Sequence, residues 1–231
     1  MTSNALVLVP GMMLDSRVYN DLEINGRVTV AEVTRASSIS QIAHDVLKQA
    51  PSRFALIGLS MGGIIAFEIW RVAPERISHI GLIDTTPYAE SLTRREMRAE
   101  QIAAVASGKL HEVIVNSMQP RYLAKRRQDD PRLRESIINQ ALSLGPEVFQ
   151  RQSLALRDRV DSTATLATID CPSLVLCGRE DQLCPVDYHL TMAAALPHAD
   201  LVVLADCGHL AVMENPIAVS SAINHLMQRH D

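Results

Sequence analysis

Short apolar runs alternate with longer amphipathic stretches over the first third of the chain. The runs have the length of strands, and most of them end at a glycine, a proline or an aspartate. Because strands buried on both faces read as continuous apolar runs, we predict a parallel sheet with helices on both sides. The predicted strands are 5–9, 28–33, 54–57 and 77–83, and the predicted helices between them are 39–50 and 62–72.

The pattern changes between residues 88 and 170, where we find helical spacing and no convincing buried strand. Prolines and glycines divide this segment into four stretches. The predicted helices are 90–108, 109–118, 131–144 and 147–160. The segment therefore has the pattern of an all-helical block placed inside an α/β chain.

Strand patterns return after this block. The remaining predicted strands are 173–177 and 201–204, and the remaining helices are 187–196 and one that follows Pro216. We expect residues 1–87 and 171–231 to form one α/β core. Residues 88–170 are then an insertion, which we expect to lie over one edge of the sheet as a helical cap.

Composition narrows the class of protein. The 231 residues are 47% hydrophobic and 21% charged, which is typical of a globular domain. No apolar run approaches the ~18 residues of a membrane span. A net charge of −4 gives no basis for nucleic-acid binding. The four cysteines form no CxxC pair and the N-terminus has the pattern of a strand instead of a signal peptide, so we expect reduced thiols in a cytoplasmic protein.

One serine occupies a position that suits a nucleophile. Gly58-Leu59-Ser60-Met61-Gly62 fits the pattern G-x-S-x-G between a predicted strand and a predicted helix. Such a turn is tight and strained, so the residues two positions before and after the serine must lack bulk, as both glycines do. The N-terminus of the following helix favours a developing oxyanion. The alternative is an ordinary loop serine.

Two further polar residues follow later strands. Asp181 comes shortly after the predicted strand 173–177, and His209 comes shortly after the predicted strand 201–204. Because the carboxyl ends of parallel strands meet at one edge of a sheet, we expect both side chains near Ser60. The chain order Ser60, Asp181, His209 is also the order expected when all three residues come from successive strand ends. Taken singly, each residue has an alternative reading as a turn residue.

On these three segments the chain resembles the α/β-hydrolase fold family. The resemblance rests on the turn GLSMGG, the turn GREDQLCP and the segment CGHLAVMENP. It implies an α/β-hydrolase fold with a six-stranded, mostly parallel sheet that lacks the leading antiparallel hairpin and carries the helical cap. It also implies that Ser60 is the nucleophile, Asp181 the acid and His209 the base of a catalytic triad.

The resemblance also implies where an oxyanion would be held. The family's loop after the first central strand is commonly His-Gly-x, and it stands here as Pro10-Gly11-Met12, so Pro10 departs from the pattern. The backbone N–H groups of Met12 and Met61 are the expected oxyanion donors. Gly11 and Met13 are expected to contact the substrate.

Nearby residues allow two other interpretations. Asp84 ends the strand before the helical block, a position that some family members use for the acid, although the turn around Asp181 matches the family pattern better. Cys184 and Cys207 flank Asp181 and His209 in sequence and would imitate a metal site. We expect no metal, because the histidine of a triad cannot also serve as a ligand.

The implied chemistry is acyl transfer to water without a cofactor. We expect a serine hydrolase that cleaves a carboxylic ester, a thioester or an enol-lactone of a small molecule, with neither nucleic acid nor a membrane as partner. Two alternatives stay open at this point. One is a ligand-binding or receptor-like protein on the same scaffold, and the other is a cofactor-free lyase or perhydrolase.

Charge is divided unevenly along the chain. Residues 88–170 hold 13 of the 22 basic residues but only 11 of the 26 acidic ones. A basic cap over an acidic core would attract esters whose far end carries a carboxylate. The alternative is that Arg94, Arg95, Arg98 and the run 125–127 only solvate helix faces. Only eight aromatic residues are present, which favours small, mostly aliphatic acyl groups.

Overall fold

The computed structural model describes residues 5–229, and its centre is one sheet of six parallel strands. The strand order is β2-β1-β3-β4-β5-β6. The strands are β1 (Ala5–Val9), β2 (Arg27–Val30), β3 (Phe54–Leu59), β4 (Ile77–Ile83), β5 (Ser173–Gly178) and β6 (Ala199–Leu204). The predicted six-stranded parallel sheet is confirmed.

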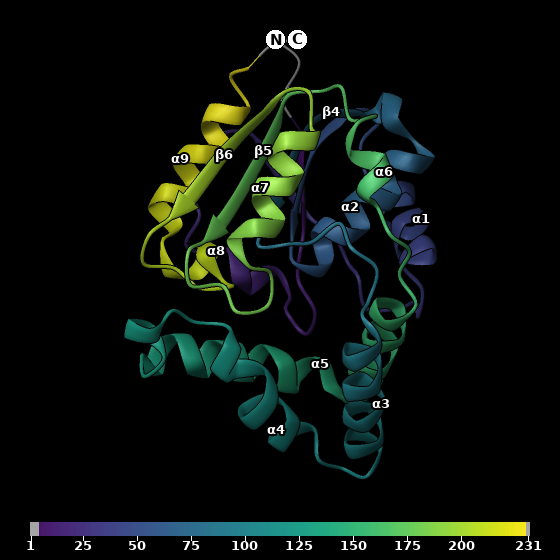
Figure 1. Cartoon of the computed structure of the whole chain (residues 1–231), viewed down its shortest axis with the longest axis vertical. Coiled ribbons are helices and arrows are strands. Elements are labelled where there is room, and N and C mark those ends of the chain that lie inside the picture. The colour runs from purple at the N-terminus through teal and green to yellow at the C-terminus, as the bar shows by residue number, and fades with distance from the viewer. Residues whose placement is uncertain (1–4, 230–231) are drawn as a thin grey trace.

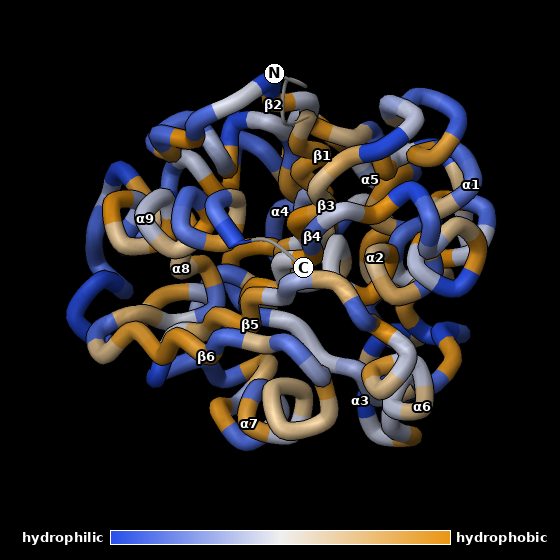
Figure 2. Tube along the Cα trace, turned by 90° about the horizontal axis from the view of Figure 1, so that it is seen from above, coloured by the Kyte–Doolittle hydropathy of each residue, from blue (hydrophilic) through white to orange (hydrophobic). Residues whose placement is uncertain are grey.

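Helices cover both faces of this sheet. The core helices are α1 (Ile39–Gln49), α2 (Met61–Val72), α7 (Val186–Ala195), α8 (Ala211–Glu214) and α9 (Pro216–Leu226). Seen from above, α1 and α2 lie on one side of the strands and α8 and α9 on the other, with hydrophobic residues along the strands between them (Figure 2). All six residues of β3 are buried, which explains why its sequence is a continuous apolar run.

The edge strand β2 differs from the prediction. Its pattern predicts a strand over 28–33 that is buried like its neighbours, whereas β2 ends at Val30 and Val28 is 40% exposed. An edge strand lies at the margin of the helix layers, so its side chains receive less cover. Beyond β2, the N–H of Ala31 still donates to the carbonyl of Leu8 at 2.8 Å before the chain leaves the sheet.

The segment between β4 and β5 consists of helices and short turns. These are α3 (Leu92–Ala106), α4 (Leu110–Val113), η3 (Ile114–Met118), η4 (Gln119–Arg121), η5 (Lys125–Arg127), α5 (Pro131–Arg157) and α6 (Thr163–Leu166). In Figure 1, α3, α4 and α5 lie together beyond the carboxyl ends of the strands. The predicted division of α5 is present as a kink, because Gly145 adopts non-helical angles (φ 84°, ψ 174°) just before Pro146.

Adjacent strands end at nearly the same level. Val9 pairs with Gly58, Leu59 pairs with Ile83, and Gly178 pairs with Leu204. The residues that follow each strand therefore meet at one edge of the sheet. This is the edge that the helices between β4 and β5 cover (Figure 1).

A buried carboxylate joins those helices to the core. Glu214 of α8 accepts the N–H of Ala124 at 2.8 Å and the N–H of Gly208 at 2.7 Å. The N–H of Leu210 in turn donates to the carbonyl of Tyr122 at 3.2 Å. The segment around Tyr122 is therefore bonded directly to the loop that carries His209.

Candidate active site

Ser60 lies in a strained turn between β3 and α2. Its φ of 54° and ψ of −114° are rare for a residue with a side chain. The turn is held at both ends, because the Ser60 N–H donates to the carbonyl of Ile83 at 2.9 Å and the Thr85 hydroxyl donates to the carbonyl of Ser60 at 2.7 Å. The hydroxyl of Ser60 is thereby presented at the edge of the sheet.

The glycines on either side of this turn are required by close packing. A Cβ added at Gly62 would lie 1.9 Å from the carbonyl oxygen of Val9, and a Cβ at Gly58 would lie 2.4 Å from the carbonyl of Gly62. Both contacts are with backbone atoms, which cannot shift as easily as the end of a flexible side chain. The sequence argument that these two positions must lack bulk therefore has a direct steric cause.

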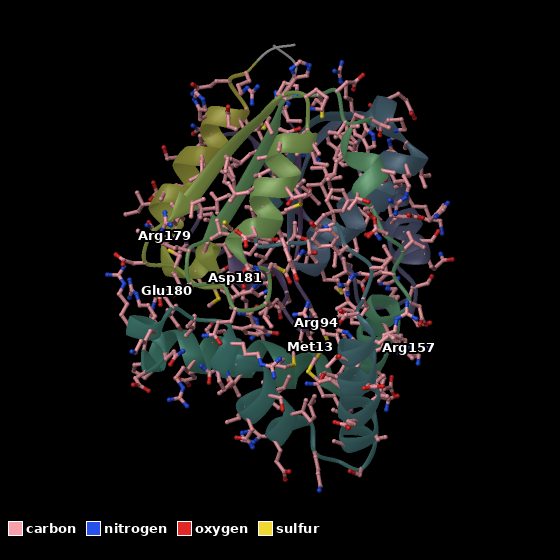
Figure 3. All side chains as sticks on the ribbon, viewed as in Figure 1. Met13, Arg94, Arg157, Arg179, Glu180 and Asp181 are labelled. Carbon is pink, nitrogen blue, oxygen red and sulfur yellow. The ribbon has the colours of Figure 1, made fainter. Side chains whose placement is uncertain are left out.

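The side chains of Ser60, His209 and Asp181 form a continuous row of hydrogen bonds. His209 Nε2 lies 2.8 Å from Ser60 Oγ, and His209 Nδ1 lies 2.8 Å from Asp181 Oδ2. The second oxygen of Asp181 accepts the N–H groups of Leu183 and Cys184 at 2.8 and 2.9 Å. Asp181 lies between the sheet and the helices beyond it, whereas Arg179 and Glu180 lie at the periphery (Figure 3).

Burial and an aromatic contact hold the ring of His209 in one orientation. His209 and Asp181 are only 3% and 6% exposed. The ring of Tyr122 stacks on that of His209, with 5.7 Å between centroids and 27° between planes. With Nδ1–H donating to the carboxylate, Nε2 is left as an acceptor for the Ser60 hydroxyl.

Asp84, the other acid that the sequence brings to this edge, has different partners. Its two oxygens accept the N–H of Gly178 at 2.9 Å and the N–H of Ala211 at 3.0 Å. Complete burial and the nearby charge of Asp181 raise the pKa of Asp84 well above its usual range. Asp84 thus joins the turn before Asp181 to the segment after His209, and it makes no hydrogen bond to the histidine.

A second buried histidine stays neutral beside this site. Burial lowers the pKa of His189 to about 4, and the ring accepts the N–H of Thr85 at Nε2 over 3.1 Å. Its Nδ1 lies 3.2 Å from the carbonyl of Pro185. His189 therefore supports the Thr85 segment that holds the Ser60 turn, and no sequence pattern pointed to it.

The loop after β1 lies beside Ser60, but its residues differ in what they contact. Met12 lines the cavity described below, and a Cβ added at Gly11 would lie 3.4 Å from Ser60 Cβ. Met13, expected to contact the substrate, is 1% exposed and lies outside the cavity lining. That expectation needs correction: the left-handed backbone of Met13 (φ 57°) turns its side chain into the core.

Gln152 of α5 holds this loop in place. Its side-chain oxygen accepts the N–H of Met13 at 2.8 Å, and its side-chain nitrogen donates to the carbonyl of Val33 at 3.1 Å. Gln152 is completely buried, so neither backbone group has water as an alternative partner. Sequence reasoning missed this residue. The signal was a polar side chain on the buried face of α5, between Phe149 and Leu156.

We expect Gln152→Ala to lower the free energy of unfolding by at least about 2 kcal/mol, because it leaves two buried backbone groups unpaired at ~1–3 kcal/mol each. Urea denaturation measures this as a lower midpoint at constant m. The matched control is Gln150→Ala on the same helix, at a half-buried position, where we expect a change within about 0.5 kcal/mol. Equal losses in the two variants would contradict the role given to Gln152.

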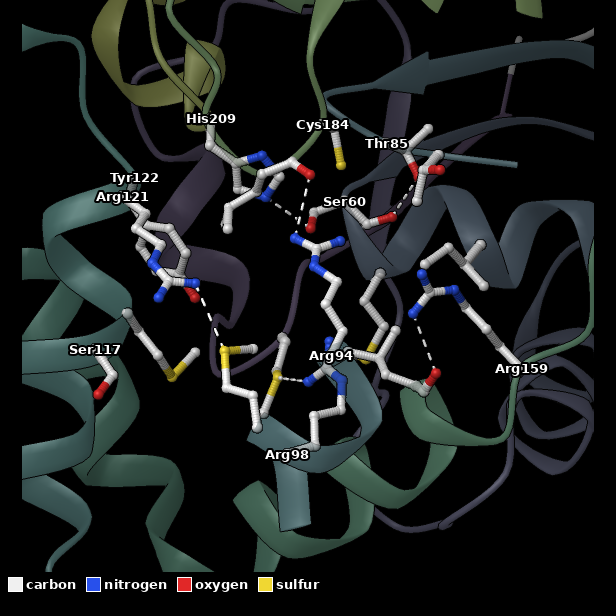
Figure 4. Close-up of a pocket in the computed structure, with 18 of the residues that line it drawn as sticks. Ser60, Thr85, Arg94, Arg98, Ser117, Arg121, Tyr122, Arg159, Cys184 and His209 are labelled. Atoms are coloured by element: carbon white, nitrogen blue, oxygen red, sulfur yellow. Dashed lines mark hydrogen bonds between the residues drawn. The ribbon is translucent and has the colours of Figure 1, made fainter. Parts of the chain in front are cut away.

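A cavity of about 90 Å³ opens onto Ser60 and His209. By the ~10–15 Å³ that one water-sized group needs, it has room for roughly six to nine such groups. Figure 4 shows it between the strand ends and the helices that cover them. Its lining residues are Met12, Ser60, Met61, Ile64, Thr85, Thr86, Arg94, Met97, Arg98, Gln101, Ser117, Met118, Arg121, Tyr122, Leu156, Arg159, Leu183, Cys184 and His209.

Among the described residues, one group has the composition of a metal site. The ligand atoms of Asp181, Cys184 and His209 lie within 4.8 Å of one another, and Cys207 is not part of the group. Burial and the charge of Asp181 raise the pKa of the Cys184 thiol well above its usual range. Because metals bind the thiolate and the other two side chains already bond to each other, this group fits a metal poorly.

Comparison with known proteins agrees with this fold. Residues 6–222 match the model of the alpha/beta hydrolase family. The chain belongs to that family. It is a hydrolase, and no helix in the described part of the chain is long and apolar enough to cross a membrane.

Two relatives have esterase names. A pimeloyl-[acyl-carrier protein] methyl ester esterase of Citrobacter koseri is 26% identical over 243 residues, covering 97% of this chain and 94% of the relative. A thermophilic esterase from Thermogutta terrifontis, solved with malate bound, is 27% identical with a TM-score of 0.86, covering 98% and 90%. The enol-lactonase of Burkholderia xenovorans LB400 shares the fold at 19% identity, with a TM-score of 0.86 and coverage of 99% and 93%.

Proposed function

We propose that the chain is a serine hydrolase that cleaves carboxylic esters of small molecules through Ser60, His209 and Asp181. The observation that carries this proposal is the row of two 2.8 Å hydrogen bonds joining Ser60 Oγ, His209 and Asp181. Both lengths fall within the range that proton transfer to a general base requires. The esterase names of two relatives support the same reaction class.

In the first half of the reaction, Ser60 Oγ attacks the carbonyl carbon of the ester while His209 Nε2 takes the hydroxyl proton. Asp181 stabilises the resulting imidazolium. The proton then passes from His209 to the leaving alcohol as its bond to the carbonyl carbon breaks. In the second half, His209 deprotonates a water molecule, which attacks the acyl-enzyme and releases the acid and Ser60.

We assign the oxyanion to the backbone N–H groups of Met12 and Met61. Met61 is the first residue of α2, and the N–H groups of a helix's first turn have no partner within the helix. Met12 lines the cavity, on the loop that Gln152 holds. The N-terminus of α2 adds its partial positive charge at the same place.

We further propose that residues 88–170 act as a cap that closes the site and forms its substrate-facing wall. This segment contributes ten of the lining residues, all of them between Arg94 and Arg159. Methionines and aliphatic groups dominate the apolar part of the wall, and Tyr122 is its aromatic residue. A lining of this kind and the small cavity favour short aliphatic acyl groups.

The proposal is tested by two measurements on the purified chain. We expect hydrolysis of p-nitrophenyl butyrate, and we expect a fluorophosphonate probe to attach one adduct at Ser60, identified by mass spectrometry. The control is a sample pre-incubated with the fluorophosphonate probe. Its loss of esterase activity should be proportional to the fraction of the protein that carries the adduct.

Absence of both turnover and labelling would contradict the proposal and favour the receptor-like alternative. Labelling at Ser60 with no ester turnover would instead favour a lyase or perhydrolase. A panel of esters, thioesters and lactones then ranks the substrates by kcat/KM.

A further inference from the structure

Positive charge is concentrated in the cavity beside Ser60. Arg94, Arg98, Arg121 and Arg159 line it, and none of the described lining residues is acidic. Arg94 and Arg98 belong to α3, Arg121 to η4, and Arg159 follows α5, so segments far apart in the sequence bring these guanidinium groups to one space. Figure 4 shows Arg94 pointing toward Ser60, with Arg98 lying further into the cap.

A single carboxylate, Glu90, serves three of these arginines. It lies 2.6 Å from Arg98, 2.7 Å from Arg159 and 3.9 Å from Arg94. Burial raises the pKa of Glu90, but the arginines outweigh it and the net shift is downward, so the carboxylate is ionised. Arg121 has no acidic partner among the described residues. Among the described residues, Glu90 is therefore the one carboxylate that pairs with these four arginines, and it pairs with three of them.

The arginines differ in how far their donors are already used. Arg159 donates to the carbonyls of Tyr88 and Leu156 and to Glu90, so it is fully engaged in holding the cap together. Arg98 donates from Nε to the carboxylate of Glu90, and its Nη1 lies 3.5 Å from the thioether sulfur of Met12. Arg121 directs Nη1 at the thioether of Met97, 3.7 Å away.

A thioether is a weak acceptor, so the contact with Met12 leaves a charged donor of Arg98 poorly satisfied. Arg121 is exposed, and its contact with Met97 leaves its guanidinium available to a ligand. Arg98 is also nearly buried, with 12% of its side chain exposed. Burial and the charges of Arg159 and Arg94 lower the pKa of Arg98, and Glu90 only partly offsets them. An anion placed between Arg98 and Arg121 would receive charge-assisted hydrogen bonds and relieve this repulsion.

We propose that Arg98 and Arg121 bind a carboxylate at the far end of the substrate's acyl chain, so that the substrate class is monoesters of short dicarboxylic acids. This inference rests on the proposed ester hydrolysis at Ser60. A planar carboxylate matches the paired donors of a guanidinium, and the 90 Å³ cavity limits the length of the chain. Arg94 lies nearer Ser60 and is partly engaged with the carbonyl of Leu183 at 3.2 Å.

The test compares kcat/KM for monomethyl succinate, glutarate and adipate with kcat/KM for the neutral ω-amide of each ester. At low ionic strength we expect a preference for at least one monoester of about tenfold or more, the scale of one charge-assisted hydrogen bond. The preference should shrink as salt rises. An ester of the same length that ends in a phosphate is measured alongside, and a stronger preference for it would overturn the choice of carboxylate.

Arg121→Gln separates this binding role from a structural one, because Arg121 has no ion pair within the described residues to lose. We expect the monoester-to-amide ratio to fall about tenfold. The matched control is Arg132→Gln in the same helical segment, where an exposed arginine pairs with Asp21, and the ratio should stay unchanged. Arg98→Lys keeps the charge but loses the paired donors, so we expect an intermediate ratio. A ratio that is the same in all four proteins would overturn the proposal.

A binding measurement distinguishes failure of the carboxylate site from failure of the ester chemistry. Glutarate is titrated calorimetrically into wild type and Arg121→Gln, with glutaramide as the neutral probe. Glutarate binding that weakens in Arg121→Gln, in a protein that hydrolyses no ester, would support the carboxylate site and reject the proposed reaction. Ester hydrolysis with equal binding of glutarate and glutaramide would do the reverse.

Discussion

Ser60→Ala is expected to lower kcat for p-nitrophenyl butyrate by about 10⁶, the scale seen when the nucleophile of a triad is removed. Without Oγ no acyl-enzyme forms, and His209 has no hydroxyl to deprotonate. Binding and the oxyanion donors remain, so KM should change much less than kcat. Steady-state kinetics measure both parameters, and mass spectrometry should detect no fluorophosphonate adduct.

Ser52→Ala is the matched control, since Ser52 is an exposed serine two residues before β3, at the opposite end of that strand from Ser60. Its kcat should equal that of the wild type. Both variants should have the wild-type unfolding midpoint, which shows that lost activity is not lost structure. A Ser60→Ala protein that keeps most of its activity would reject the proposed mechanism as a whole.

Asp181→Asn is expected to lower kcat by about 10⁴. The asparagine amide would donate toward His209 and leave the ring in the tautomer that cannot accept the Ser60 proton at Nε2. The fold should survive, because the amide oxygen can still accept the N–H groups of Leu183 and Cys184. The pH dependence of kcat and the unfolding midpoint are measured together.

Asp84→Asn is the matched comparison at the same edge of the sheet. It replaces one of the two oxygens that accept the N–H groups of Gly178 and Ala211, so we expect a loss of stability of about 1–3 kcal/mol and a much smaller loss of kcat. If Asp84→Asn loses more kcat than Asp181→Asn, the acid belongs to the strand before the helical segment.

Local patterns predicted those parts of the fold that depend on local chemistry. Strands 5–9 and 77–83 match β1 and β4 to the residue, because buried parallel strands must be apolar throughout. The tight turn at Ser60 was recognisable because two glycines are needed where backbones touch. The helix predicted from residue 90 begins two residues later, at Leu92, although the cap that fixes this start, Ser91 accepting the N–H of Arg94, is also a local contact.

Contacts between distant segments were not predictable in this way. Gln152 and Met13 are 139 positions apart, and only the folded chain shows that one holds the other. Arg121 and Arg159 line the cavity, whereas Arg95 and the run 125–127, which drew attention by their charge, do not. The sequence gives the number of charges in a segment, but which of them point inward depends on how its helices pack.

The carboxylate of Glu214 has a consequence for attempts to exchange caps between members of this family. Because Glu214 accepts one N–H from Ala124 and one from Gly208, the inserted segment and the loop before His209 share a single buried acceptor. A transplanted segment that offers no donor there would leave half of this carboxylate unsatisfied and free to shift beside the histidine. Recombination between homologues would therefore preserve activity only if the incoming segment places a backbone N–H where that of Ala124 meets Glu214.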